Sequence, residues 1–229
     1  TKGSCCFVTS DFPSENPRSQ NRNYSYTNTL PTIMTNAIFH SSEFEFKGIP
    51  IPEFNIESGK LIRLCVPNYD SKGNDLVRNF RYELLNHFDN EIPNSKWSKE
   101  YSNSGFLKFW KSITVEDYII SKLNIDKTNA EMIAEYLEFD LKEKVEKLIL
   151  GKRKALAIKC DFENHDTLIF DYYGVGANEF EYLEKIVDVE IKKGKRGIVI
   201  DRLEFNQKEE TNKNINRAKI TVGNNVYKK

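Results

Sequence analysis

Apolar residues recur along this chain with two different periods, which predict strands and helices in alternation. Short apolar or alternating runs, typical of strands, occupy residues 42–47, 61–66, 167–170, 197–200 and 218–222. Apolar residues at steps of three and four, typical of helices, occupy residues 74–88, 114–123, 128–139, 141–160 and 180–191. Because strands alternate with helices near both ends of this pattern, the sequence predicts an α/β sandwich with parallel strands.

Polar residues at the predicted helix starts indicate three side-chain caps. Asn74 precedes the first helix, Thr114 the second, and Thr128 or Asn129 the third. Residues of these types accept hydrogen bonds from free backbone N–H groups in the first helical turn. We therefore expect the helices to begin at these positions.

Composition excludes several functional classes. The 229 residues carry 34 basic and 34 acidic side chains, so net charge gives no general attraction to nucleic acid or anionic membranes. A hydrophobic share of 39% excludes a wholly disordered chain. No apolar run approaches the roughly 18 residues of a membrane span. Four scattered cysteines without zinc-type spacing predict a reducing, cytoplasmic compartment.

Residues 1–33 differ from the rest of the chain. They are rich in Ser, Asn, Pro and Thr, follow no apolar period, and lack the features of a secretory signal. Because Met34 opens the patterned sequence, we expect translation to start there and residues 1–33 to be a disordered leader of upstream or artificial origin. An ordered extension is the alternative. The predicted domain is therefore residues 34–229.

Several segments resemble, in order, the motifs of a known family. Residues 59–72 place an apolar strand before Pro-Asn and Lys72, residues 145–157 place Gly151 ahead of a basic helix, and Asp171 ends an apolar strand. Their order and spacing resemble those of ATP-binding cassette (ABC) ATPases over about residues 42–205. The resemblance implies a P-loop NTPase-like ABC ATPase sandwich with a small antiparallel β portion and a reduced helical arm at about residues 96–160.

The resemblance also implies a nucleotide site. In that family the loop after the first strand binds phosphate, and the aspartate that ends the Walker B strand faces magnesium. The corresponding positions would make ATP and Mg²⁺ the cofactors of this chain. The implied nucleotide-binding residues are Asn68, Ser71, Lys72, Gly73 and Asn74, and the implied metal residue is Asp171.

The same positions lack most of the groups that hydrolysis requires. A phosphate loop needs glycines because its backbone N–H groups turn inward and the phosphates approach closely. A tyrosine phenol with its ordinary pKa near 10 is a poor general base at neutral pH. The substituted positions are Val66, Tyr69 and Ser71 for the loop glycines, Gly73 for the magnesium-binding hydroxyl, Tyr172 for the catalytic glutamate, and Asp201 and Arg202 for the switch histidine.

These losses predict a pseudoenzyme: a non-catalytic ABC-ATPase-like domain that acts as scaffold or regulatory partner in a protein complex, with nucleotide binding weak or lost. The expected protein partner is another cassette, a second copy or a membrane subunit. One alternative is an atypical transporter subunit that binds or hydrolyses ATP with a partner cassette. A second is a nucleic-acid or protein-binding module that uses the aromatic and lysine residues in 96–111. The basic run at 152–154 is expected to be a solvated helix face.

Overall fold

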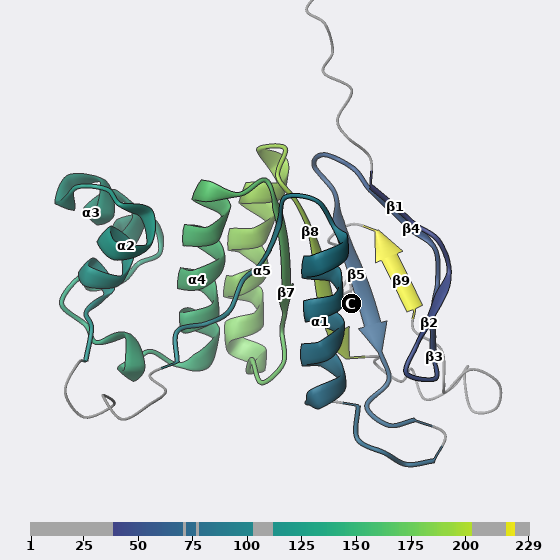
Figure 1. Cartoon of the computed structure of the whole chain (residues 1–229). Coiled ribbons are helices and arrows are strands. Elements are labelled where there is room, and N and C mark those ends of the chain that lie inside the picture. Colours follow the sequence, from purple (N-terminus) through teal and green to yellow (C-terminus); the bar gives the residue numbers. More distant parts are fainter. Residues whose placement is uncertain (1–38, 71, 77, 103–111, 203–218, 223–229) are drawn as a thin grey trace, which may run out of the picture. The chain divides into compact units, whose positions relative to one another are not determined.

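A five-stranded sheet lies at the centre of the computed structural model, which describes residues 39–70, 72–76, 78–102, 112–202 and 219–222 (Figure 1). The strand order is β6-β7-β8-β5-β9. The four parallel strands are β6 (Ser95–Trp97), β7 (Thr167–Asp171), β8 (Arg196–Arg202) and β5 (Leu61–Val66), and β9 (Lys219–Val222) pairs antiparallel with β5. The predicted α/β fold with parallel strands is therefore confirmed.

Helices cover both faces of this sheet. Because successive side chains of a strand point to opposite faces, Leu61 packs with α4 (Leu150–Asn164) and α5 (Ala177–Lys192), whereas Ile62 packs with α1 (Asn79–Glu91). The two cores are separate apolar clusters on opposite faces of the same strands. The sequences of the parallel strands are nearly continuous apolar runs because the strands are buried on both faces.

A small antiparallel portion adds to the face that α1 covers. Two strand pairs form it: β1 (Phe39–Ser41) with β4 (Phe54–Ile56), and β2 (Phe44–Phe46) with β3 (Ile49–Ile51). The apolar residues of β3 and β4 are buried in the same cluster as the α1 side chains. The predicted antiparallel portion is therefore present.

The helical arm contains α2 (Val115–Leu123), α3 (Lys127–Tyr136) and the short 3-10 helix η2 (Val145–Lys147). Thr114 caps α2 as predicted, because its side chain accepts a hydrogen bond from the Asp117 N–H while Asp117 accepts from the Thr114 N–H. The predicted cap of α3 is wrong. Asp126 is the N-cap, and its carboxylate accepts from the N–H of Asn129 at 2.9 Å.

Two other helix starts differ from the prediction. Helix α1 begins at Asn79 after Arg78, which makes no side-chain cap, because the amide groups of Asn74 are bonded to Asp70. The expected helix at 141–160 is instead η2 followed by α4. The chain ahead of η2 is held by α2, since the N–H groups of Val115 and Glu116 donate to the carbonyls of Glu143 and Leu141.

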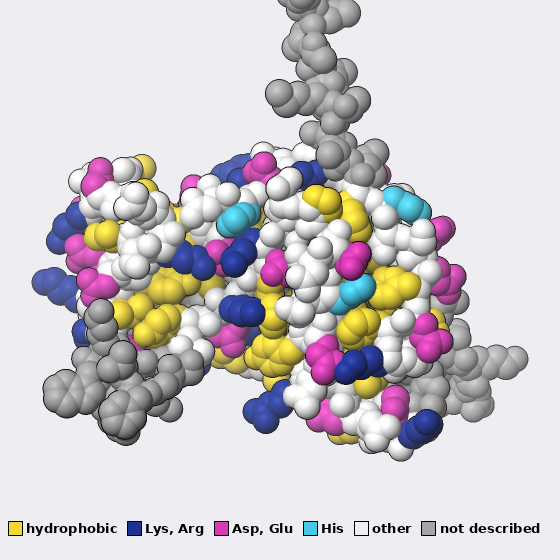
Figure 2. Space-filling model, viewed as in Figure 1, with side chains coloured by type: hydrophobic (Ala, Val, Ile, Leu, Met, Phe, Trp, Pro, Cys, Tyr) yellow, Lys and Arg dark blue, Asp and Glu magenta, His cyan; other side chains and the backbone are white. Residues whose placement is uncertain are grey.

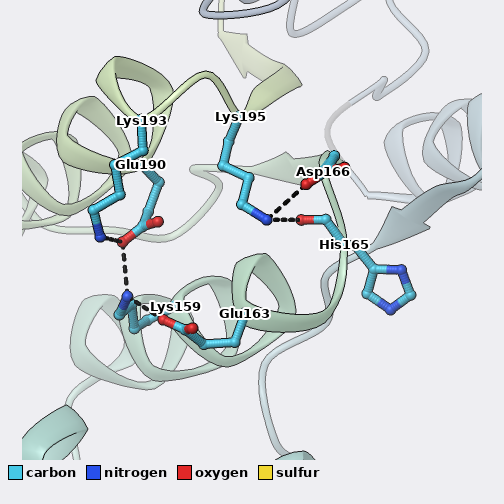
Figure 3. A network of polar contacts seen from close by, with 7 residues as sticks. All are labelled: Lys159, Glu163, His165, Asp166, Glu190, Lys193 and Lys195. Carbon is cyan, nitrogen blue, oxygen red and sulfur yellow. Dashed lines mark hydrogen bonds and ion pairs between the residues drawn. The ribbon is translucent and has the colours of Figure 1, made fainter. Parts of the chain in front are cut away.

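A buried network of charges joins α4 to α5 (Figure 3). Lys159 of α4 donates to Glu190 of α5 at 2.7 Å and also pairs with Glu163, while Lys193 donates to Glu190 at 2.9 Å. Only 2% of Glu190 is exposed. Its two lysine partners hold the pKa of Glu190 below its ordinary value although burial alone would raise it. The network fixes the two helices that cover one face of the sheet.

Some predicted features lie outside the described residues, namely the leader at 1–33, Ser71 and the C-terminal part of the aromatic stretch from 103 to 111. Within the described ranges, no helix combines the length and apolar character needed to cross a membrane. Cys65 and Cys160 are buried and form no disulfide, as expected of small core residues, and burial raises the pKa of Cys160 to about 12.

Close packing of α4 against α5 predicts that Gly151→Ala lowers stability. An added Cβ would lie 2.6 Å from the Cβ of Glu179. Alanine normally favours a helix over glycine by about 0.5–1 kcal/mol, but overpacking costs about 1–3 kcal/mol, so we expect a net loss of about 1–2 kcal/mol in urea unfolding. Gly176→Ala is the control, because its Cβ would meet only ordinary contacts. Equal stability of Gly151→Ala and wild type would contradict this packing.

Candidate functional site

The candidate site lies where the parallel strands of the sheet end. The carboxyl ends of adjacent parallel strands meet at one edge, which is the usual ligand-binding edge of an α/β sheet. Here β5 runs into the loop at 67–78, β7 ends at Asp171, and β8 carries Asp201 near its end. The structure thus brings the predicted loop and the predicted metal residue to the same edge.

The Asp70 carboxylate is bonded inside its own loop. Its Oδ1 accepts from the backbone N–H groups of Lys72 and Asn74, each at 2.8 Å, and its Oδ2 accepts from the Asn74 side-chain amide at 2.7 Å. These hydrogen bonds, that of the Asn74 side chain above all, hold the pKa of Asp70 below its ordinary value. Backbone N–H groups of the kind that bind phosphate in a P-loop therefore already bind an internal anion.

Hydrogen bonds between described residues of the loop form a tight turn rather than a helix start. The N–H of Gly73 donates to the Asp70 carbonyl, and the N–H of Leu76 donates to the Asn68 carbonyl at 2.8 Å. Gly73 has a positive φ of 81°, which glycine adopts without strain. Lys72, whose side chain is exposed, lies seven residues before the first residue of α1. In a P-loop the corresponding lysine lies at the loop–helix junction, so its placement here differs.

Asp171 is paired with a buried lysine of α4. The Lys154 Nζ donates to the Asp171 Oδ1 at 2.6 Å, and the same oxygen accepts from the N–H of Tyr173 at 2.8 Å. Lys154 is 6% exposed, so the predicted solvated basic face is wrong for this residue. Lys154 lies three residues after Gly151 and four before Ile158, which are both buried. That helical spacing is the sequence signal that identifies Lys154 as an inward-facing residue.

A second charged cluster, which the sequence interpretation missed, lies on the sheet face covered by α5. Arg63 of β5 is 1% exposed and donates to Asp201 at 2.8 Å and to Glu184 of α5 at 2.7 Å. The position predicted for a switch histidine is therefore an acidic partner of a buried arginine. A single charged residue within the otherwise apolar run at 61–66 is the signal that could have found it.

Tyr172, at the position of the catalytic glutamate, packs inside the same cluster. The Arg63 guanidinium lies 5.3 Å from the centre of its ring, and the Phe180 ring packs edge-on at 5.1 Å. Burial and the nearby Glu184 carboxylate raise the pKa of Tyr172 well above its ordinary value. The phenol therefore keeps its proton at neutral pH and cannot serve as a general base.

The described part of the aromatic and lysine stretch serves packing. Trp97 is buried in the cluster that α1 covers, with the Tyr82 ring at 5.6 Å and the Lys99 Nζ at 3.5 Å from its ring centre. Tyr101 packs edge-on against Tyr118 of α2 at 6.0 Å. These rings are not arranged as a free stacking platform.

The described residues contain no group of three or more His, Cys, Asp or Glu side chains placed to hold a metal ion. Asp171 Oδ1 is bonded to two donors, and the loop amides serve Asp70. The contacts at this edge consequently do not fit Mg²⁺ and phosphate without rearrangement.

Comparison with solved structures decides the fold. A Pyrococcus furiosus protein assigned as the ATP-binding component of an ABC transporter is 14% identical, with a TM-score of 0.53 over 74% of this chain and 93% of the other. A metal-chelate type ABC transporter in an inward-facing conformation is 12% identical, with a TM-score of 0.50 over 73% of each chain.

The chain has the ABC ATPase fold. At these identities the likeness concerns fold alone. Neither a protein-family profile nor a curated protein sequence matches the chain. Within this ABC ATPase fold, the residues at the carboxyl edge of the sheet decide what the domain can do.

The ion pair between α4 and β7 predicts that Lys154→Ala strongly destabilises this ABC ATPase fold. Removing one partner of a buried pair costs about 3–5 kcal/mol, and we expect about 2–4 kcal/mol here because Asp171 retains some exposure. The double variant Lys154→Met/Asp171→Asn should lose less than Lys154→Ala, since it leaves no uncompensated charge. Urea unfolding measures both, and a Lys154→Ala protein as stable as wild type would refute the assignment.

A pH dependence follows from Asp188 of α5. Burial and the neighbouring Glu184 raise its pKa, outweighing the attraction of Lys192 and Arg63, and its Oδ1 is buried without a hydrogen-bond partner among the described residues. A raised folded-state pKa favours the folded state below the unfolded pKa, and this contribution is lost as pH rises through the folded-state pKa. Asp188→Asn should therefore raise Tm at pH 7 more than at pH 4.

Asp166→Asn is the matched control for the Asp188 prediction. The ion pair with Lys195 lowers the pKa of Asp166, so its contribution is present above the unfolded pKa and lost as pH falls. Asp166→Asn should slightly lower Tm at pH 7 and leave it unchanged in acid. A Tm of Asp188→Asn that follows the same pattern as this control would contradict the interpretation.

Proposed function

We propose that this chain is a non-catalytic ABC-ATPase-like domain that acts as a scaffold or regulatory partner in a protein complex. The observation that carries the proposal is the 2.6 Å pair between Lys154 and Asp171. The aspartate that would face magnesium has the ammonium group of Lys154 beside it. A divalent cation at Asp171 would be repelled by the ammonium group unless Lys154 moved out of the core.

Two further contacts support the loss of catalysis. The Asp70 carboxylate takes the backbone N–H donors of its loop, so an incoming phosphate would compete with an anion that is already tethered in place. Tyr172 is buried and keeps its proton, so it offers no base to activate water. The proposal assigns no catalytic residue to this chain.

Residual nucleotide binding is the open part of the proposal. Lys72 is exposed and remains available to a phosphate group in this loop. The name of the Pyrococcus neighbour says that it binds ATP, and the same ligands here would be ATP and Mg²⁺. Because binding is proposed to be weak or lost, contact through the candidate residues would be made only well above about 1 mM ligand, with Asp171 as the metal residue only after its release from Lys154. The candidate nucleotide-binding residues are Asn68, Ser71, Lys72, Gly73 and Asn74.

The proposed partner is a protein: another cassette, a second copy of this chain or a membrane subunit. The fold and both apolar clusters are retained while the catalytic positions carry other side chains. This combination favours a role that depends on the folded surface of the domain and not on ATP hydrolysis. Figure 2 shows acidic and basic side chains mixed over one face of the molecule, which gives little support to a nucleic-acid role. Cys65 and Cys160 are buried outside any disulfide, which agrees with the proposed cytoplasmic location.

Calorimetric titration with Mg-ATP and Mg-ADP tests the proposal. We expect no heat of binding from wild type or from Lys72→Ala at ligand concentrations below about 100 µM. The expected Kd is above about 1 mM, which corresponds to a binding free energy smaller in magnitude than about 4.1 kcal/mol. We also expect the same Tm with and without nucleotide. Binding below about 100 µM that Lys72→Ala abolishes would contradict weak or lost nucleotide binding. ATP turnover above that of an added active cassette alone, and lost in Lys72→Ala, would overturn the non-catalytic role and favour the atypical transporter subunit.

A further inference from the structure

An open hollow of about 490 Å³ lies on the helical arm, away from the carboxyl edge of the sheet. Its walls are the first turn of α2, one side of α3 and the turn at 139–142. A space of this size holds one or two side chains with part of their backbone. The hollow is therefore large enough for a short peptide segment.

The floor of the hollow is apolar and firmly held. Ala134 of α3 is 1% exposed, Phe139 is 8% exposed, and Leu141 is partly buried beside them. The Phe139 ring lies near the ring of Tyr182 of α5, whose hydroxyl donates to the Leu137 carbonyl at 2.6 Å. An apolar side chain placed here would bury surface against a floor that is already fixed in position.

The rim of the hollow is acidic. Four carboxylates line it, from Glu116, Glu131, Glu135 and Asp140, against the two lysines Lys127 and Lys142. Lys127 is paired with Glu116 at 3.1 Å. Residues 113–149 contain nine acidic and five basic side chains, an excess of four negative charges in a chain whose net charge is zero. The arm therefore concentrates negative charge around an apolar floor.

We propose that this hollow docks a basic segment of a protein partner, with an apolar side chain between lysine or arginine residues. The apolar side chain would contact Ala134 and Phe139, and the flanking cations would face Glu131 and Glu135. Complementary charge fixes the register of such a segment and speeds its association. Nucleic acid and anionic membranes carry the wrong charge for this rim.

This docking surface does not depend on the proposed loss of catalysis. The hollow belongs to α2, α3 and the turn that follows them, and none of its lining residues touches the loop at 67–78 or Asp171 in any of the contacts described above. A domain that hydrolysed ATP would have the same surface. Binding measured without nucleotide therefore tests the docking surface alone.

Fluorescence polarisation with a labelled peptide, Gly-Lys-Arg-Leu-Arg-Lys-Gly, tests the proposal on the full chain. We expect the peptide to bind wild type, Glu131→Gln/Glu135→Gln to weaken binding about threefold, and Glu131→Lys/Glu135→Lys to weaken it at least tenfold. Binding should also weaken between 50 and 500 mM NaCl, because exposed charges are screened. Replacing the central leucine of the peptide by serine should weaken binding independently of salt.

The matched control is Glu91→Lys/Glu181→Lys, which makes the same change of charge at exposed positions of α1 and α5 outside the hollow. Circular dichroism melting of each variant establishes that the arm remains folded. Loss of binding in the hollow variants alone supports the docking surface. Equal loss in the control pair, binding unaffected by any variant, or no binding to wild type would overturn it.

Discussion

The ion pair between Lys154 and Asp171 is the contact on which the interpretation of this domain depends. A lysine that is 6% exposed needs a counter-ion, and the end of β7 provides one at 2.6 Å. The pair joins α4 to the edge of the sheet and, in the same contact, occupies the aspartate that would face magnesium. One contact therefore stabilises this edge of the sheet and carries the proposed loss of metal binding.

Charged groups on the neighbouring strand and loop are also paired within the protein. Arg63 is buried within β5 and is compensated by Asp201 and Glu184, and Asp70 is compensated by the N–H groups of its own loop. Asp171, Tyr172 and Asp201, at positions that would serve nucleotide chemistry in an ABC ATPase fold, are here parts of internal contacts. At this edge the charges of Arg63, Lys154, Asp171 and Asp201 are paired within the protein.

Much of the fold could be predicted from the sequence because its determinants are local or periodic. The apolar runs of β5, β7 and β8 and the Thr114 cap are visible in short windows, and the order of motifs indicated the ABC ATPase fold. Helix α1 was placed five residues too early because Asn74 donates its backbone and side-chain N–H groups to Asp70 within the loop and does not cap a helix. Competition of this kind depends on loop geometry and leaves no periodic signal.

The candidate site was predictable in position but not in its contacts. Lys154 and Asp171 are 17 residues apart, and Arg63 and Glu184 are 121 residues apart, so neither pair is visible in a local pattern.

The most direct measurement is a crystal structure grown with Mg²⁺ and a non-hydrolysable ATP analogue at millimolar concentration. The account predicts an intact Lys154–Asp171 pair, Asp70 bonded within its loop and no nucleotide at this edge. Nucleotide bound there, with Asp171 turned from Lys154 toward a metal ion, would contradict it.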